Sequence, residues 1–309
     1  MLDCASVLRE SGRLDDARDR LQQSRDLFEG LVREQPANQV LRGRLADVYE
    51  EGASLHIDAG QLDEALPMLR RGLEISEGLA AANPPVTLYR SMVAGCRVKL
   101  GWVLRTLGRT SEALDCLARS IELAEGLVAE DPGSAGYRNL LAQCLTQGGN
   151  LLLAEGRTTE ALPKLRRSLD IQDAVARAQP DVVSHFGALS NSLRGVGRAE
   201  VAAGHPTEAL AAFERAGAIE QSLAEKYPGS RYNLACSLAL MIPIAPPDRR
   251  DDLARRAMDE LRLARASGYA NIANLQIDHD LDALRDRPDF RDFLLDMAFP
   301  ANPFAGATE

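Results

Sequence analysis

The residue types that most often carry enzyme chemistry are few and scattered in this sequence. The four histidines lack the close spacing of metal ligands: His56, His185, His205 and His279. Asp278 and Asp280 flank the last of them, and a solvated loop whose aspartate caps the next helix explains this triplet better than a metal site. No GxSxG or Cys/His arrangement stands out, and no GxGxxG, HRD or DFG sequence is present. We therefore expect no catalytic residue, metal ion or cofactor in this chain.

Two arginines and one tryptophan are better candidates for binding a ligand. Arg194 and Arg198 are four residues apart, so they share one face if the segment is helical. Together with Asn150 and Asn191, they could hold a carboxylate or phosphate of an extended peptide. Trp102, the only tryptophan, could supply an aromatic contact. The alternatives are a solubilising pair of charges and a tryptophan that serves packing.

The composition indicates a helical protein. The 309 residues are 45% hydrophobic, 26% charged and only 5% aromatic, and long alternating runs of β-branched residues are missing. A net charge of -9 argues against nucleic acid or an anionic membrane as partner. No signal peptide is evident, and no apolar run reaches the roughly 18 residues of a membrane span. The five cysteines form no CxxC pair, which favours buried thiols in a cytoplasmic protein.

Self-similarity is the strongest signal in the sequence. The stretches SGRLDDAR, AGQLDEAL, LGRTSEAL, EGRTTEAL and AGHPTEAL align, and each copy follows the previous one by 48 residues. Three positions keep this step without an insertion. They are the glycines Gly12, Gly60, Gly108, Gly156 and Gly204, the alanines Ala17, Ala65, Ala113, Ala161 and Ala209, and the prolines Pro36, Pro84, Pro132, Pro180 and Pro228.

Each unit reads as two antiparallel helices. Apolar residues recur with helical spacing on both sides of the proline, and glycine and proline stand where helices stop. The spacing therefore predicts helices of roughly 20 residues, about 30 Å long. Pro67 and Pro163 fall about two turns into such helices. They predict either a mild bend or a later helix start.

These positions resemble the tetratricopeptide repeat. That family has a small residue seven positions before the turn glycine, alanine five after it, and a large and a small residue further on. This chain complies in its units, for example with Gly149, Ala161, Leu165 and Ser168. The family repeat has 34 residues, so 48 implies about two extra turns per helix. The resemblance implies a right-handed superhelical α-solenoid, with five repeats in 1–228 and the first one truncated.

The same resemblance implies that the first helix of each pair lines a concave groove. Its inward positions lie thirteen, ten, six and three residues before the turn glycine. They make the groove acidic at one end and arginine-rich at the other, and they do not match the Lys/Asn/Arg clamp of chaperone-binding members. The candidate binding residues are Asp47, Glu50, Trp102, Arg105, Gln143, Asn150, Asn191, Arg194 and Arg198.

The two ends depart from the repeat. Met1 stands eleven residues before Gly12, so the first helix is cut, which indicates an upstream continuation, a fragment or a binding edge. We expect a degenerate sixth repeat in 229–268, a helical cap in 269–300 and a disordered tail in 301–309. Short helices are predicted near 280–285 and 288–297. Their apolar residues would close the end of the stack: Leu281, Leu284, Phe290, Phe293 and Leu294.

A second resemblance concerns this C-terminal part. The sequences YNLAC, DxDLxxLRxxPxF and DxAFPxxPF are similar to the C-terminal ends of large bacterial serine/threonine protein kinases. The resemblance implies a non-enzymatic scaffold or regulatory tail of a signalling protein that binds a protein or an extended peptide. The alternatives are the C-terminal portion of a kinase whose catalytic domain lies upstream, and a peptide-sensing regulator. The oligomeric state stays open.

Overall fold

The computed structural model describes residues 14–227, 229–269 and 271–298. Every regular element in these ranges is a helix and none is a strand, so the predicted all-α class is confirmed. No helix in the described ranges has both the length and the apolar character needed to cross a bilayer. The chain divides into two compact units, 1–177 and 178–309, and each is a separate structural body here. Gly12, the cut first helix and the tail 301–309 lie outside the described residues.

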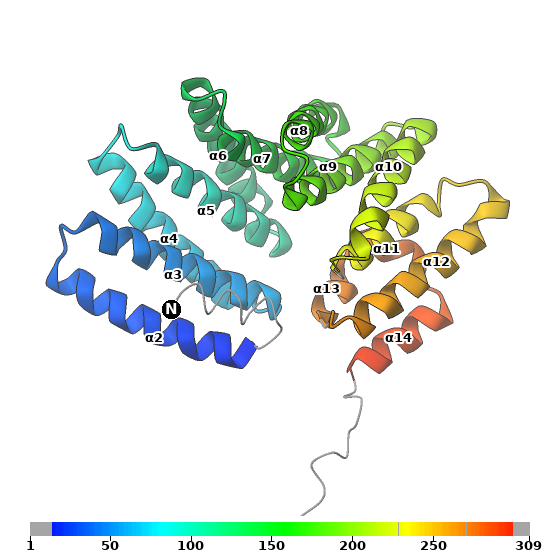
Figure 1. Cartoon of the computed structure of the whole chain (residues 1–309), viewed down its shortest axis with the longest axis horizontal. Coiled ribbons are helices and arrows are strands. Elements are labelled where there is room, and N and C mark those ends of the chain that lie inside the picture. Colours follow the sequence, from blue (N-terminus) through cyan, green and yellow to red (C-terminus); the bar gives the residue numbers. More distant parts are fainter. Residues whose placement is uncertain (1–13, 228, 270, 299–309) are drawn as a thin grey trace, which may run out of the picture. The chain divides into compact units, whose positions relative to one another are not determined.

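The first unit is a series of antiparallel helices of nearly equal length (Figure 1). Helix α3 packs on α4 and α5 packs on α6, while α5 also contacts α3 and α7. The first helices of successive pairs are therefore neighbours. The helices are α2 (Leu14–Glu34), α3 (Gln39–Asp58), α4 (Leu62–Ala82), α5 (Thr87–Thr106), α6 (Thr110–Glu130), α7 (Ala135–Ala154) and α8 (Thr158–Ala178).

The second unit continues the helix pairs and then changes character. Helix α9 packs on α10, α10 on α11, and α11 on both α12 and η1. The elements after α12 are shorter helices (Figure 1). They are α9 (Val183–Ala202), α10 (Pro206–Ala224), α11 (Gly229–Met241), α12 (Pro247–Ala266), α13 (Ile272–Ile277), the 3₁₀ helix η1 (His279–Leu284) and α14 (Pro288–Ala298).

The repeated glycine ends the first helix of each pair in a left-handed conformation. Its φ is 72° at Gly60, 73° at Gly108, 72° at Gly156 and 81° at Gly204. After α7, the Gly156 N–H donates to the Leu153 carbonyl at 3.0 Å and the next N–H, from Arg157, donates to Leu152 at 2.9 Å. These two bonds form the Schellman motif, which satisfies the last carbonyls of the helix. A side chain would strain this position, which explains the glycine at each 48-residue step.

The small residues of the repeat lie where two helices approach each other. The repeated alanines of the described pairs are fully buried. A Cβ placed on Gly149 would lie 2.6 Å from Leu165 Cγ, and one on Gly101 would lie 2.7 Å from Leu117 Cγ. In the second unit, a Cβ on Gly197 would overlap the ring of Phe213. The large residue of each second helix thus fills the space that the small residue of the first helix leaves open.

The prolines do not delay the helix starts. Helix α4 begins at Leu62 and α8 at Thr158, so Pro67 and Pro163 lie inside the helices and the predicted later start is wrong. Each proline stands at the sixth helical residue, where the lost N–H would otherwise bond to the carbonyl four residues earlier. The bend at these positions stays a prediction.

The C-terminal residues form an apolar core with α11 and α12. Leu281 and Leu284 of η1 and Phe290 of α14 are buried in one cluster with Met258. Leu294 packs against the same cluster and is partly buried. Helix α13, capped by Asn271, was not expected from the sequence. The domain limits 229–268 and 269–300 stay a prediction.

Candidate functional site

The candidate binding residues fall into two groups, one in each unit. Helices α3, α5 and α7 carry Asp47, Glu50, Trp102, Arg105, Gln143 and Asn150, and α9 carries Asn191, Arg194 and Arg198. Within the first unit, α5 contacts both α3 and α7. We call the side of these three helices that bears the candidate residues the α3–α5–α7 face. The two groups have different surroundings and are treated in turn.

The acidic part of the α3–α5–α7 face already has cationic neighbours. Lys99 Nζ lies 2.7 Å from Glu50 Oε1 and 3.3 Å from Ser54 Oγ. Arg44 Nη1 lies 3.6 Å from Asp47 Oδ2. Burial raises the pKa of Asp47, and Arg44 offsets part of that effect. The acidic end predicted from the sequence is therefore charge-balanced.

Sequence reasoning missed Lys99, although a signal for it exists. Lys99 follows Glu50 by 49 residues, one more than the repeat length. Residues about one repeat apart lie on the neighbouring first helix at nearly the same height. Opposite charges at this separation therefore predict an ion pair between repeats, in the same way that a four-residue separation predicts one within a helix.

Trp102 is partly packed and partly open. It is half-buried and contacts the core cluster that contains Leu100 and Leu104. Seven residues earlier, two turns along the same helix face, Gly95 has open space around it, and an added Cβ would meet no atom within 4 Å. Core packing thus explains the buried part of the Trp102 side chain. The helix surface at Gly95 carries no side chain and has open space above it.

Helix α7 contributes uncharged amide side chains to this face. Gln143 is exposed, and Gln147 and Asn150 are half-buried. These residues follow one helix face at intervals of four and three. An amide side chain can donate and accept a hydrogen bond at the same time, as a peptide group does.

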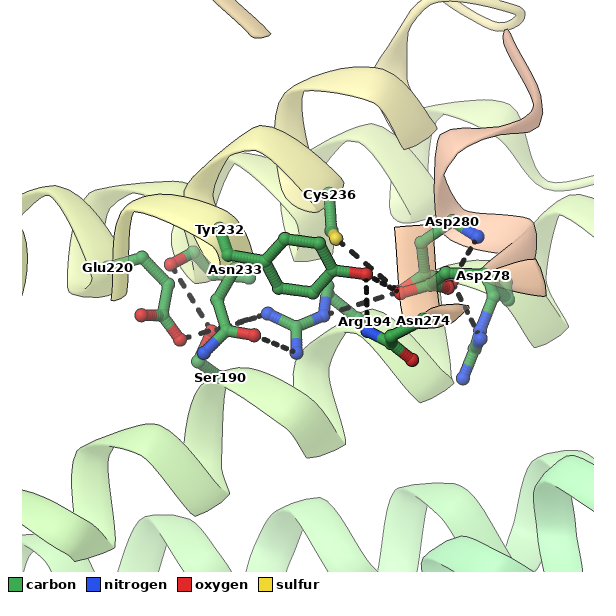
Figure 2. Close-up of polar contacts among 11 residues, drawn as sticks. Ser190, Arg194, Glu220, Tyr232, Asn233, Cys236, Asn274, Asp278 and Asp280 are labelled. Atoms are coloured by element: carbon green, nitrogen blue, oxygen red, sulfur yellow. Dashed lines mark hydrogen bonds and ion pairs between the residues drawn. The ribbon is translucent and has the colours of Figure 1, made fainter. Parts of the chain in front are cut away.

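The arginines of α9 are differently placed, as Figure 2 shows for Arg194. The Arg194 side chain is only 8% exposed, and its guanidinium lies 3.7 Å from Glu220 of α10 and 3.6 Å from Asp280 of η1. Arg198 Nη1 donates to the same aspartate at 2.7 Å. The anion beside this arginine pair is thus Asp280 of the same chain. Arg194 is not an open surface charge, which differs from the expectation of an arginine-rich groove end.

Further polar groups extend this cluster around Asp278 (Figure 2). The Tyr232 hydroxyl donates to the Asp278 carboxylate and accepts a hydrogen bond from Asn274 Nδ2 at 2.8 Å. The Tyr232 ring stacks on Tyr269 with centroids 4.6 Å apart. Burial raises the pKa of Tyr232 and raises that of Tyr269 to about 12, so both hydroxyls stay protonated. Asp278 also caps η1 by accepting from the Asp280 N–H at 3.0 Å, as the sequence suggested.

Three possible metal ligands meet in this cluster. Ligand atoms of Cys236, Asp278 and Asp280 lie within 4.8 Å of one another. The Arg194 and Arg198 guanidiniums already supply positive charge to Asp280. Burial raises the pKa of the Cys236 thiol, which favours the neutral form rather than the thiolate that binds metals. The arrangement suits hydrogen bonding and ion pairing within the protein.

Comparison with known proteins supports the repeat assignment. Residues 93–132, which span most of α5 and all of α6, match the tetratricopeptide repeat family. The helix pairs are tetratricopeptide-like repeats. None of the curated proteins matches the sequence.

Several solved structures share the tetratricopeptide-like fold. BtubC (BKLC) from P. vanneervenii is 16% identical with a TM-score of 0.58, and the match covers 83% of this chain and 93% of that one. A Rap protein complexed with Competence and Sporulation Factor is 12% identical with a TM-score of 0.55, covering 96% and 86%. Aspartyl phosphate phosphatase F from Bacillus subtilis is 14% identical with a TM-score of 0.51, covering 86% and 64%. At these identities the likeness concerns the fold.

Proposed function

We propose that this protein is an interaction scaffold that binds an extended segment of a partner protein on the α3–α5–α7 face. The observation that carries the proposal is the pairing of Trp102 with an open glycine, Gly95, two turns away on the same helix. Tryptophan is enriched among the residues that carry most of the binding energy at protein interfaces. The tetratricopeptide-like repeats support a binding role, since stacked helix pairs form extended binding surfaces.

The side chains of this face favour a peptide of low net charge. Glu50 is paired with Lys99 and Asp47 lies beside Arg44, so neither offers an uncompensated charge to a strongly basic ligand. The exposed amide of Gln143 can bond to peptide groups irrespective of the ligand's side chains. We therefore expect main-chain recognition by α7 and one apolar side chain of the ligand near Trp102.

A peptide-selection experiment tests this function. Peptides selected from a display library against the full chain are titrated while the fluorescence of Trp102, the only tryptophan, is recorded. Gly95→Arg fills the open space and should weaken binding at least tenfold, which corresponds to about 1.4 kcal/mol. The fold should tolerate this change, because no atom lies near the new Cβ and arginine favours a helix more than glycine does.

The matched control is Gly126→Arg on α6, where an added Cβ also meets no atom within 4 Å. Its affinity should equal that of the parent. If both variants bind the selected peptides equally well, the α3–α5–α7 face is not the binding surface.

The wider context of the scaffold is a second part of the proposal. The similarity of YNLAC and DxDLxxLRxxPxF to kinase C-terminal ends favours a regulatory or partner-recruiting tail in bacterial cytoplasmic signalling. A coding sequence for GxGxxG and HRD joined upstream would identify the chain as the C-terminal portion of a protein kinase. An upstream region without these sequences would count against it.

A peptide-sensing regulator is the other candidate. One structure with this fold is a Rap protein complexed with Competence and Sporulation Factor, at a TM-score of 0.55. X-ray scattering with and without a selected peptide distinguishes the two roles. A sensor should change its radius of gyration on binding, whereas a passive scaffold should not.

A further inference from the structure

The arginine pair of α9 links three elements through one chain of charges. Arg198 Nη1 lies 2.7 Å from Asp280 Oδ1, Arg194 Nε lies 3.6 Å from Asp280 Oδ2, and Arg194 Nη1 lies 3.7 Å from Glu220 Oε1. Asn233 of α11 and Ser190 of α9 also bond to the Arg194 guanidinium, both at 3.4 Å (Figure 2). These contacts therefore connect α9, α10 and α11 to the start of η1.

These charges occur in one helix pair only. In the first helices of the earlier pairs, the register of Arg194 is taken by Glu50, Val98 and Thr146, and that of Arg198 by Ser54, Trp102 and Asn150. Glu220 corresponds to Gln172 in α8. Among the first helices that the structure describes, α9 alone has arginine at both positions.

The apolar contacts of the C-terminal segment do not by themselves fix its docked position. Residues 272–298 bury Leu281, Leu284 and Phe290, and hydrophobic burial is non-directional. The segment packs on α11 and α12 through these apolar side chains. Apolar burial alone would therefore allow it to shift along these helices without a single preferred position.

Buried ion pairs supply the missing selectivity. They contribute little net stability compared with apolar residues of the same size, but a buried charge that lacks its partner is strongly unfavourable. Asp280 is buried, so docking residues 272–298 in a position away from the arginines would leave its carboxylate unpaired.

We propose that Arg194, Arg198 and Glu220 form an intramolecular recognition site for Asp280, which fixes the position in which residues 272–298 dock on α11 and α12. The site discriminates by penalising the wrong positions rather than by strengthening the right one. Its ligand is a carboxylate of the chain itself.

The experiment replaces four charges with neutral residues, three of them taken from the preceding repeat. Arg194→Thr, Arg198→Asn and Glu220→Gln introduce the residue types of Thr146, Asn150 and Gln172, and Asp280→Asn neutralises the segment. The melting temperature should stay within a few degrees of the parent. Methyl NMR should show several signals for buried Met258 in place of one, because the segment no longer has a single docked position.

Two further variants make the result decisive. Asp280→Asn alone should lower the melting temperature, because it removes the carboxylate beside Arg198 and leaves Arg194 with Glu220 as its acidic neighbour. The control Arg249→Thr with Glu214→Gln removes an exposed pair of the same unit and should change neither signal number nor melting. One Met258 signal in the fourfold variant, or failure of that variant to fold, would overturn the proposal, since the charges would then be dispensable or simply stabilising.

Discussion

The α7–α8 and α9–α10 helix pairs have the same register, but different side chains make the buried polar contacts in each pair. In α7–α8, Ser168 Oγ donates to the Ala142 carbonyl at 2.8 Å and lies 2.7 Å from Thr146 Oγ1. In α9–α10, the hydroxyl stands on the opposite helix, where Ser190 Oγ donates to the Ala216 carbonyl at 3.5 Å. The register of Thr146 is there occupied by Arg194, which faces Glu220.

This difference shows which contacts can recur in every repeat and which are specific to one helix pair. Neutral hydroxyls find their acceptor within the helix pair, so the same junction can recur without reference to distant residues. A buried arginine needs a partner with charge, and Arg194 has Glu220 within the pair and Asp280 from outside it. The hydroxyl junction of α7–α8 therefore uses residues of its own pair, whereas the arginines of α9–α10 also depend on η1.

The strongest test of this contrast removes one charge from the second pair. Arg194→Met should lower the free energy of unfolding of the second unit by about 3 kcal/mol or more, because it leaves Glu220 and part of Asp280 uncompensated in a buried place. Urea unfolding followed by hydrogen exchange measures the loss for α9–α11. A loss no larger than that of an exposed pair such as Arg157 and Glu160 would show that the buried charges are not coupled.

The close approach of α7 and α8 at Gly149 can be disrupted by a larger side chain. Gly149→Leu should destabilise the first unit by about 2–3 kcal/mol, since even its Cβ would lie 2.6 Å from Leu165 Cγ. Gly126→Leu, whose Cβ meets no atom within 4 Å, is the matched control and should be neutral or stabilising. Equal denaturation midpoints for the two variants would contradict the packing assigned to Gly149.

The hydroxyl junction should have a smaller effect. Ser168→Ala removes the donor to Ala142 and the partner of Thr146, and it should cost about 1 kcal/mol. The corresponding position of α10 is already an alanine, Ala216, so the backbone tolerates the change. Thermal denaturation of Ser168→Ala checks the value. A loss of stability as large as that of Gly149→Leu would mean that removing the hydroxyl disturbs more than its own hydrogen bonds.

The smallest expected effect is a change in pH dependence. Burial raises the pKa of Glu220, so its protonation favours the folded state, and that contribution is full below the ordinary carboxyl pKa. The contribution is lost as the pH rises through the raised pKa. Glu220→Gln should therefore gain stability relative to the parent as the pH increases through that range. Urea unfolding at several pH values tests this, and a constant difference between parent and variant would refute it.

Much of the fold could be predicted from the sequence because the same local signals for turns and helices recur in every repeat. The glycine of each turn, the alanine beside the neighbouring helix and the helix lengths of about 20 residues all follow from spacing. Helix α13 escaped prediction because six residues are too few to show a period.

The site was less predictable because its contacts join residues far apart in sequence. The helical spacing places Arg194 and Arg198 on one helix face, but no pattern links them to Asp280, 82 residues after Arg198. The packing of Trp102 also depends on neighbours in other repeats. In both cases the fold determined the neighbours of the residue.

The left-handed glycines have a consequence for the gene as well as for the protein. Gly108 and Gly156 have almost the same φ, 73° and 72°, and each is followed by an arginine and a threonine. A deletion of residues 109–156 would join Gly108 to Arg157 and recreate the same turn. Recombination between homologous stretches of the coding sequence could thus shorten or lengthen the chain by whole helix pairs while every remaining turn keeps its hydrogen bonds.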